Sequence, residues 1–484
     1  MPKVNTLKID PHPLYELSPW LYMQFMEPLG TTDNSVEAAW DHGTQKWRED
    51  VIKTTRELAP PLIRWGGIYS AYSHWREAVG LRDKRVPVFN IIWGGMETSQ
   101  IGTGEFVEFC EEVGAEPFFC VNFMSDGRPK WSKYPDGSPR IGYSQEAAEW
   151  VDYCNNPDNA ERIAHGRRKP YNLKLWQIGN ETSYFTNPED GIPCEEAARR
   201  TVQFAQAMRK ADPSLSLIGW GDSGWAAKML DIAGEHLQYI AFHVHYGGPS
   251  PGVLKNNDYR KDWSQTWEQL MDSCNVWDNK INEMRREISG YDIKLALTEG
   301  HFALPGRTRC EVLSSWAAGV ANARMLNVFA RHGDVLKIAT LADFCGNRWM
   351  NNAIYVQTPG NISYMMPVAQ VTSLFSRHTG SHAVSFTGET DGLDITVSRK
   401  ADRFYLHAAN TNMTRDIPVS FEIDGYNIES GAVYELCKEP EWEIMHTNYK
   451  ELAVKETPLG ENNAWCFPAA SVSAVELNVK KAKD

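Results

Sequence analysis

Two glutamates each follow a short apolar run that has the composition of a buried strand. Residues 173–178 lead through Gly179 and Asn180 to Glu181, and residues 293–298 lead to Glu299. Cleavage of a glycosidic bond commonly uses two such carboxyl groups, one protonated and one ionised. The two glutamates therefore indicate glycoside hydrolysis, provided that the fold brings them together. A single glutamate at a strand end is more often a solvated loop residue or a helix-cap partner.

Eight apolar runs are spaced widely along the chain and are separated by amphipathic segments that are predicted to be helices. Continuous apolar runs that alternate with helices are typical of a parallel sheet covered on both faces. Eight of them within about 330 residues predict an α/β fold, a (β/α)8 TIM barrel, over residues 18–378. The eight runs are residues 20–26, 61–65, 117–122, 173–178, 215–220, 239–246, 293–299 and 335–341.

The pattern of apolar and polar residues changes after the predicted barrel. Residues 379–484 contain short segments of alternating polarity between Gly, Asp and Asn turns, a pattern typical of antiparallel strands. We expect an all-β sandwich, jelly-roll-like domain there. Residues 1–17 include a strand-like stretch that precedes the barrel, and we expect it to complete the sandwich.

The polar residues at the strand ends should form one site, because the active site of such a barrel lies at the C-terminal ends of its strands. We expect Glu181 to be the general acid/base and Glu299 the nucleophile, about 5 Å apart, which gives retention of configuration. The donor must then have the higher pKa of the two. Further polar residues at these ends are Glu27, Arg64, Asn122, Asn180, His243, His245 and Tyr246.

Several of these residues have an expected role. Asn180 is expected to hydrogen-bond the sugar 2-OH, and Arg64 to hydrogen-bond the nucleophile and lower its pKa. Thr298 and His301 could orient the carboxylate of Glu299. The His243–His245 pair could instead bind a metal, but the spacing offers no third ligand, so we expect neither metal nor cofactor.

Composition limits the partners. The chain has 484 residues and a net charge of −13, which argues against nucleic acid or an anionic membrane and is compatible with a neutral oligosaccharide. Nine cysteines without a CxxC pair favour reduced thiols and a cytoplasmic location, and no apolar leader or membrane-length run is visible. Eighteen tryptophans are compatible with sugar stacking or simply with a core.

Four segments together make the sequence recognisable: residues 26–30, 97–106, 146–155 and 174–181, with residues 297–299 at the expected nucleophile position. From about residue 22 to 378 the chain resembles glycoside hydrolase family 51, the α-L-arabinofuranosidases. The resemblance implies retaining exo-cleavage of terminal α-L-arabinofuranosyl residues from arabinan or arabinoxylan fragments. It also implies no cofactor and a homo-oligomer, often a hexamer. The sugar contacts it implies are Glu27, Arg64, Asn180, His243 and His245.

The chain departs from the family at positions that are expected to contact the sugar. The loop after Arg64 runs Trp65-Gly66-Gly67-Ile68, with an apolar residue where the family binds a hydroxyl. His245 stands where the family has Tyr, and Asp343 where it has Gln. We count Trp65 and Asp343 in the expected substrate shell, and these changes could alter the preferred sugar.

Two other functions fit the same residues. One keeps the mechanism but acts on a β-xyloside, a β-glucan or another furanoside. The other is a carbohydrate-binding protein on a decayed barrel, against which the retention of both carboxylates argues.

Overall fold

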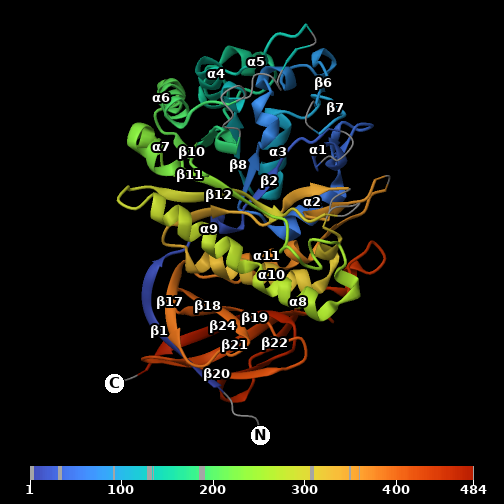
Figure 1. The fold of residues 1–484 in the computed structure, drawn as a ribbon, viewed down its shortest axis with the longest axis vertical. Helices are drawn as coiled ribbons and strands as arrows, with labels where there is room; N and C mark the ends of the chain where they lie inside the picture. Colours follow the sequence, from blue (N-terminus) through green and yellow to red (C-terminus); the bar gives the residue numbers. More distant parts are fainter. Residues whose placement is uncertain are drawn as a thin grey trace.

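The protein consists of an α/β part and a smaller all-β part (Figure 1). The computed structural model describes residues 5–30, 35–90, 93–127, 133–134, 136–184, 191–305, 310–347, 350–358 and 360–482. In Figure 1 the α/β part lies above and the C-terminal sheet below, with α10 and α11 at their junction. The predicted α/β class and the separate C-terminal sheet domain are confirmed.

Eight strands of the α/β part pair in parallel, each with its neighbour in chain order. They are β2 (Gln24–Met26), β5 (Leu62–Trp65), β8 (Glu116–Val121), β9 (Leu175–Ile178), β10 (Ser216–Trp220), β11 (Tyr239–Tyr246), β12 (Lys294–Phe302) and β13 (Leu336–Ala339). All fall within the predicted apolar runs or overlap them. The first run is shorter as a strand than predicted, because Ser18 caps a 3-10 helix that starts with Pro19.

The two ends of this series meet. The backbone N–H of Met23 donates to the carbonyl of Ala339 at 3.0 Å, and β14 (Asp343–Gly346) pairs in parallel with β2. The last strand is thus broken into β13 and β14, and both halves contact the first strand. β15 (Asn352–Val356) and β16 (Ser363–Met365) extend the sheet beyond β14.

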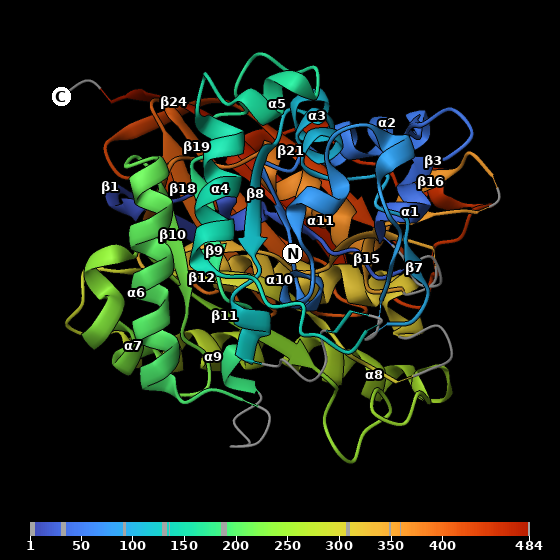
Figure 2. The ribbon, with the colours of Figure 1, turned by 90° about the horizontal axis from the view of Figure 1, so that it is seen from above.

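Helices lie between the strands and cover the sheet (Figure 2). They are α1 (Ser35–Ala39), α2 (Glu49–Leu58), α3 (Thr103–Val113), α4 (Ser144–Asn155), α5 (Ala160–Ala164), α6 (Cys194–Ala211), α7 (Ala226–Ala233), α8 (Trp263–Asp272), α9 (Cys274–Glu287), α10 (Trp316–Arg331) and α11 (Pro367–Arg377). α3 ends where predicted, at Gly114 in the left-handed conformation (φ 80°). Nearly every residue of α10 is buried, as expected for a helix that is apolar on most sides.

The C-terminal sheet has nine strands, and β1 (Asn5–Glu16) belongs to it. β1 pairs antiparallel with β17 and parallel with β20. The other strands are β17 (His382–Thr387), β18 (Leu393–Lys400), β19 (Arg403–Asn410), β20 (Ile417–Ile423), β21 (Tyr426–Cys437), β22 (Lys455–Pro458), β23 (Ala464–Phe467) and β24 (Ser471–Lys481). Their alternate residues form a separate apolar core that includes Leu7, Val397, Leu406 and Val475. Two small hairpins pair β3 (Trp40–Asp41) with β4 (Lys46–Trp47) and β6 (Val88–Phe89) with β7 (Met96–Glu97).

All nine cysteines are free thiols, as expected from their spacing. None of the helices in the described part of the chain combines the length and the apolar character needed to cross a bilayer.

Candidate active site

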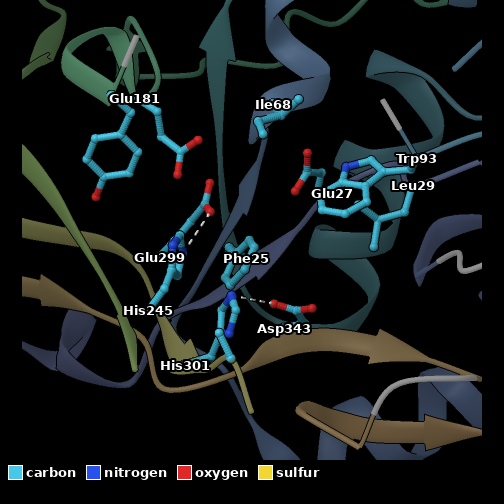
Figure 3. Close-up of a pocket in the computed structure, with 12 residues that line it drawn as sticks. Phe25, Glu27, Leu29, Ile68, Trp93, Glu181, His245, Glu299, His301 and Asp343 are labelled. Carbon is cyan, nitrogen blue, oxygen red and sulfur yellow. Dashed lines mark ion pairs between the residues drawn. The ribbon is translucent and has the colours of Figure 1, made fainter. Parts of the chain in front are cut away.

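A pocket of about 280 Å³ opens at the C-terminal ends of the parallel strands (Figure 3). The lining residues come from six strand ends and the loops that follow them, so residues far apart in sequence meet there. They are Phe25, Glu27, Leu29, Ile68, Trp93, Glu181, Tyr184, His245, Glu299, His301, Ala303 and Asp343.

The two predicted catalytic glutamates face each other. In Figure 3 their carboxyl groups point into the same part of the pocket, and one carboxylate oxygen of each lies within 4.8 Å of the other. Both side chains are buried. After β9 the chain turns through Gly179 (φ 85°) and places Glu181 itself at φ 55°. This left-handed backbone is strained for a residue with a side chain, and such strain is often found at functional sites.

Arg64 lies beneath this pair and is fully buried at the end of β5. Its Nη1 donates to Oε1 of Glu299 at 2.8 Å, its Nη2 to Oδ1 of Asn180 at 2.7 Å, and its Nε to Oε1 of Gln177 at 2.9 Å. The expected contact between Arg64 and Glu299, the predicted nucleophile, is therefore present. Asn180 is held by its oxygen, and its Nδ2 has no hydrogen-bond partner among the described residues.

His245 lines the pocket, and His243, two residues away on the same face of β11, is buried against both glutamates. Nδ1 of His243 lies 3.1 Å from Oε1 of Glu181 and 3.6 Å from Oε2 of Glu299. Nε2 of His245 lies 3.6 Å from the same Oε2. Nε2 of His243 lies 3.0 Å from Oγ1 of Thr298, so Thr298 orients His243 rather than the carboxylate of Glu299.

These contacts separate the pKa values of the buried carboxyl groups. Burial would raise the pKa of Glu299, but the charge of His243, the hydrogen bond from His245 and the guanidinium of Arg64 outweigh it and hold this pKa below its ordinary value. Glu27 has the opposite balance. Burial and the charge of Glu299 hold the pKa of Glu27 well above its ordinary value, although the N–H of Tyr69 donates to it at 3.0 Å.

The loop after β5 allows Glu27 to sit there. A Cβ at Gly67 (φ 133°) would lie 2.3 Å from the carboxyl carbon of Glu27, so this position requires glycine. Ile68 follows and lines the pocket, which places an apolar side chain near the catalytic pair (Figure 3).

The opposite wall is made by His301 and Asp343. Nε2 of His301 lies 3.7 Å from Oδ1 of Asp343, and Nδ2 of Asn351 donates to Oδ2 of Asp343 at 3.2 Å. The ring of His301 packs against that of His245, with centroids 4.6 Å apart. Burial and the neighbouring charge of His245 lower the pKa of His301 to about 3. His301 thus pairs with Asp343, and no contact between it and the carboxylate of Glu299 is seen, contrary to our expectation.

Three residues counted in the site lie elsewhere. Trp65 is absent from the pocket lining and packs against Phe106 at 5.0 Å, because it points to the opposite face of β5 from Arg64. Tyr246 likewise alternates with His245 and packs against Phe302 at 5.9 Å. Asn122 donates to backbone carbonyls, including that of Ser73, and so holds a loop.

Other pocket residues were not foreseen from the sequence. Phe25 lies two residues from Glu27, so strand alternation would have found it. Trp93 comes from a loop and Tyr184 from the short 3-10 helix Thr182–Tyr184, where the alternation rule does not apply. Of the eighteen tryptophans, Trp93 is the one that the described lining includes, and several others are fully buried in the core.

Folding also assembles a group that the sequence spacing did not reveal. One ligand atom each from Glu181, His243, His245 and Glu299 lies within 4.8 Å of the other three. The third metal ligand that the chain spacing did not offer is therefore supplied by other strands.

A pair of facing carboxyl groups at the mouth of a parallel α/β sheet, one held ionised by an arginine, defines a glycoside hydrolase. The sequence comparisons name the family. A model described as "Alpha-L-arabinofuranosidase 1 domain" matches residues 54–265, and one described as "Alpha-L-arabinofuranosidase C-terminal domain" matches residues 275–471. The chain belongs to glycoside hydrolase family 51, the α-L-arabinofuranosidase family.

Individual relatives agree with this assignment. An "Intracellular exo-alpha-(1->5)-L-arabinofuranosidase" of Halalkalibacterium halodurans is 28% identical over 68% of this chain and 67% of its own length. A "Probable alpha-L-arabinofuranosidase C" of Aspergillus niger is 34% identical, but the match spans 45% of this chain and 42% of the relative. The fold matches the Thermotoga maritima α-L-arabinofuranosidase with a TM-score of 0.80 at 21% identity, over 98% of this chain and 100% of that one.

Proposed function

We propose that the protein is a retaining exo-α-L-arabinofuranosidase that releases terminal α-L-arabinofuranosyl residues from arabinan- or arabinoxylan-type oligosaccharides. The observation that carries the proposal is the separation of Glu181 and Glu299, whose nearest carboxylate oxygens lie within 4.8 Å. Retaining enzymes hold the two groups about 5 Å apart, whereas inverting enzymes leave room for a water between them. The names of the relatives supply the sugar.

In the first step Glu299 attacks the anomeric carbon through a carboxylate oxygen. The bond to the leaving oxygen breaks as Glu181 donates its proton to that oxygen, and a glycosyl ester on Glu299 forms. Arg64 and the two histidines keep Glu299 ionised before the attack. In the second step Glu181 takes a proton from water, the water oxygen attacks the anomeric carbon, and the ester bond to Glu299 breaks.

The surrounding residues orient the sugar. Nδ2 of Asn180, a buried donor without a partner in the described part of the chain, donates to the 2-OH. The raised pKa of Glu27 keeps its carboxyl protonated over a wider pH range, so it can both donate to and accept from sugar hydroxyls. A pocket of about 280 Å³ is at the small end for ligand sites and suits one terminal sugar, which supports exo-cleavage.

We also propose that the ring of parallel strands is a (β/α)8 barrel spanning residues 18–378, and that residues 379–484 with 1–17 form a jelly-roll-like sandwich. The parallel pairing of eight successive strands and the contact between Met23 and Ala339 support the barrel. The pairing of β1 with β17 and β20 supports the sandwich.

A homo-oligomer and a cytoplasmic location complete the proposal. The exposed side chains of Leu81, Val86 and Phe89 line a cleft of about 960 Å³ and support contact with a second copy. The word "Intracellular" in the names of two relatives supports the location. Light scattering on the purified chain measures the oligomer, and a monomeric mass refutes it.

The activity is tested with matched aryl glycosides. We expect hydrolysis of the aryl α-L-arabinofuranoside and little or none of the β-D-xyloside and β-D-glucoside, with ¹H NMR showing that the first anomer released is the α form. Activity confined to a pyranoside would refute the sugar, and release of the β anomer first would refute retention.

A further inference from the structure

We propose that the protein binds a divalent transition-metal cation of the Zn²⁺ class between Glu181, His243, His245 and Glu299, and that this cation blocks the active site. The block rests on the proposed function, because it requires both carboxylates to be catalytic. The binding itself depends on the geometry alone.

The spacing of the four side chains fits a tetrahedral ion. Zinc bonds of about 2.0–2.2 Å to nitrogen and oxygen place neighbouring ligand atoms about 3.3–3.6 Å apart. Here Nδ1 of His243 lies 3.1 Å from Oε1 of Glu181 and 3.6 Å from Oε2 of Glu299, and Nε2 of His245 lies 3.6 Å from the same Oε2. All remaining pairs lie within 4.8 Å.

The contacts of Glu299 and His243 leave one ligand atom of each directed at the group. Arg64 takes Oε1 of Glu299, so Oε2 is the oxygen that faces both imidazoles. His243 can donate its Nε2–H to Oγ1 of Thr298 at 3.0 Å, and this tautomer leaves the Nδ1 lone pair directed at the group. A metal-binding histidine normally has such a partner on its second nitrogen.

The charge of the pocket also favours a cation. Four carboxyl groups, those of Glu27, Glu181, Glu299 and Asp343, line this pocket, and Arg64 contacts that of Glu299. A divalent ion would offset the repulsion among them. Two imidazoles with two carboxylates are a donor set that zinc accepts, whereas magnesium and calcium prefer oxygen ligands alone.

His245 makes this a property of this chain. The resemblance to the family places Tyr at this position, and a phenol in place of the imidazole removes one of the two nitrogen ligands. His245, which replaces the family's Tyr at a position expected to contact the sugar, therefore also supplies the fourth ligand of the cation site.

Binding is tested by titrating Zn²⁺ into the full chain by calorimetry, in a Cys437→Ser/Cys466→Ser background that removes the two exposed thiols. We expect one equivalent to bind, and Co²⁺ in its place to give the visible absorption of a tetrahedral ion. His245→Asn should weaken binding at least tenfold, since even the loss of a group behind a ligand costs 10–100-fold. Thr298→Val, which removes the partner of His243, should weaken it about tenfold.

His12→Asn is the matched control, because its ring is 85% exposed on β1 and far from the pocket. Equal binding by wild type, His245→Asn and Thr298→Val would overturn the site, as would the absence of a stoichiometric equivalent in wild type. A variant that fails to fold is recognised by its thermal melt, and the other variant then decides.

Inhibition is measured separately on the aryl α-L-arabinofuranoside. We expect Zn²⁺ to compete with substrate in wild type, with an inhibition constant that rises at least tenfold in His245→Asn. If Zn²⁺ binds but the protein hydrolyses no arabinofuranoside, the proposed function fails and the cation site stands. If the protein hydrolyses the substrate and Zn²⁺ neither binds nor inhibits, the cation site fails and the function stands.

Discussion

The mouth of the sheet and the junction with the C-terminal domain both bury carboxylates, but they balance the charge differently. At the junction Asp394 of β18 meets two arginines of α10: it accepts from Nε of Arg324 at 3.0 Å and from Nη1 of Arg331 at 2.7 Å. At the mouth four carboxyl groups line one pocket, and Arg64 pairs with one of them, Glu299. Asp394 at the junction therefore meets two cations, whereas Glu27 at the mouth feels the charge of neighbouring carboxyl groups, that of Glu299 above all.

The pKa values reflect this difference. Although burial raises the pKa of Asp394, the arginines outweigh it and lower this pKa below its ordinary value. Burial and Glu299 raise that of Glu27. A lowered carboxyl pKa stabilises the fold near neutrality, and a raised one destabilises it. Asp394 at the junction thus stabilises the protein, whereas Glu27 at the mouth lowers its stability, a trade seen at many active sites.

The largest expected effect is the loss of activity when Glu299 at the mouth is replaced. Glu299→Ala removes the nucleophile and should lower kcat on the aryl α-L-arabinofuranoside by at least about 10⁴-fold. Added azide should restore turnover, because the small anion fits the space left by the carboxylate and gives a β-arabinofuranosyl azide. Glu422→Ala, an exposed glutamate on β20, is the control. Loss of less than tenfold, or no azide product, would contradict the role of Glu299.

The next effect tests the junction. Asp394→Asn leaves two arginines facing a neutral amide and should lower the free energy of unfolding by about 2 kcal/mol, the scale for hydrogen bonds to a charged group, because the partly exposed arginines are screened by solvent. Denaturant unfolding measures it, and kcat below the transition should stay within twofold of wild type. A neutral or stabilising result would mean that the junction does not differ from the mouth in the way proposed.

The pH dependence of stability gives an effect of similar size at the same junction. His407 of β19 stacks on Phe375 at 4.0 Å and its Nε2 lies 2.9 Å from the carbonyl of His378, whose ring faces Glu476. Burial lowers the pKa of His407 to about 4, against about 6.5 when unfolded. The unfolded chain therefore binds a proton first as pH falls, and stability is lost from about pH 6.5 down to about pH 4. The loss by pH 5 is about 2 kcal/mol.

His407→Gln keeps a donor for the carbonyl of His378 but does not titrate in this range. Its unfolding free energy should fall less between pH 8 and pH 5 than that of wild type, by about 2 kcal/mol. His12→Gln, at an exposed ring, should leave the difference unchanged. Parallel pH curves for His407→Gln and wild type would show that His407 does not carry this dependence.

The sequence predicts where the strands end at the mouth better than it predicts which other side chains line the pocket. Apolar runs located the strands, and Glu181 and Glu299 at their ends met as expected, because all C-terminal ends of a parallel sheet lie on one side. The direction of each side chain needed the alternation rule: it separates Arg64 from Trp65 and His245 from Tyr246. The position of Tyr184 follows the left-handed turn at Glu181, and no residue pattern predicts that turn.

The charge balance was also invisible in the sequence. Glu27, Asp343 and the two facing glutamates are separated by up to 316 positions, and nothing in their spacing shows that they line one pocket. Asp394 looks like any turn-proximal aspartate until α10 places Arg324 and Arg331 beside it. The pairing of charges across elements is a tertiary property, so the contrast between mouth and junction emerges only from the fold.

The smallest expected effect tests the comparison most directly, because it makes the same chemical change at the mouth that Asp394→Asn makes at the junction. Glu27→Gln replaces a buried carboxyl group that faces Glu299 with a neutral amide of the same shape, which can still accept from the N–H of Tyr69. Removing this carboxyl group should raise the free energy of unfolding by about 1 kcal/mol at pH 7, the value of one pKa unit. The melting temperature should rise by about 1–2 °C. The sugar loses a hydrogen-bond partner, so kcat/KM should fall about tenfold. If the free energy of unfolding rises in Glu27→Gln and falls in Asp394→Asn, the carboxylate at the mouth destabilises the fold and the one at the junction stabilises it. Changes of equal sign would remove this distinction.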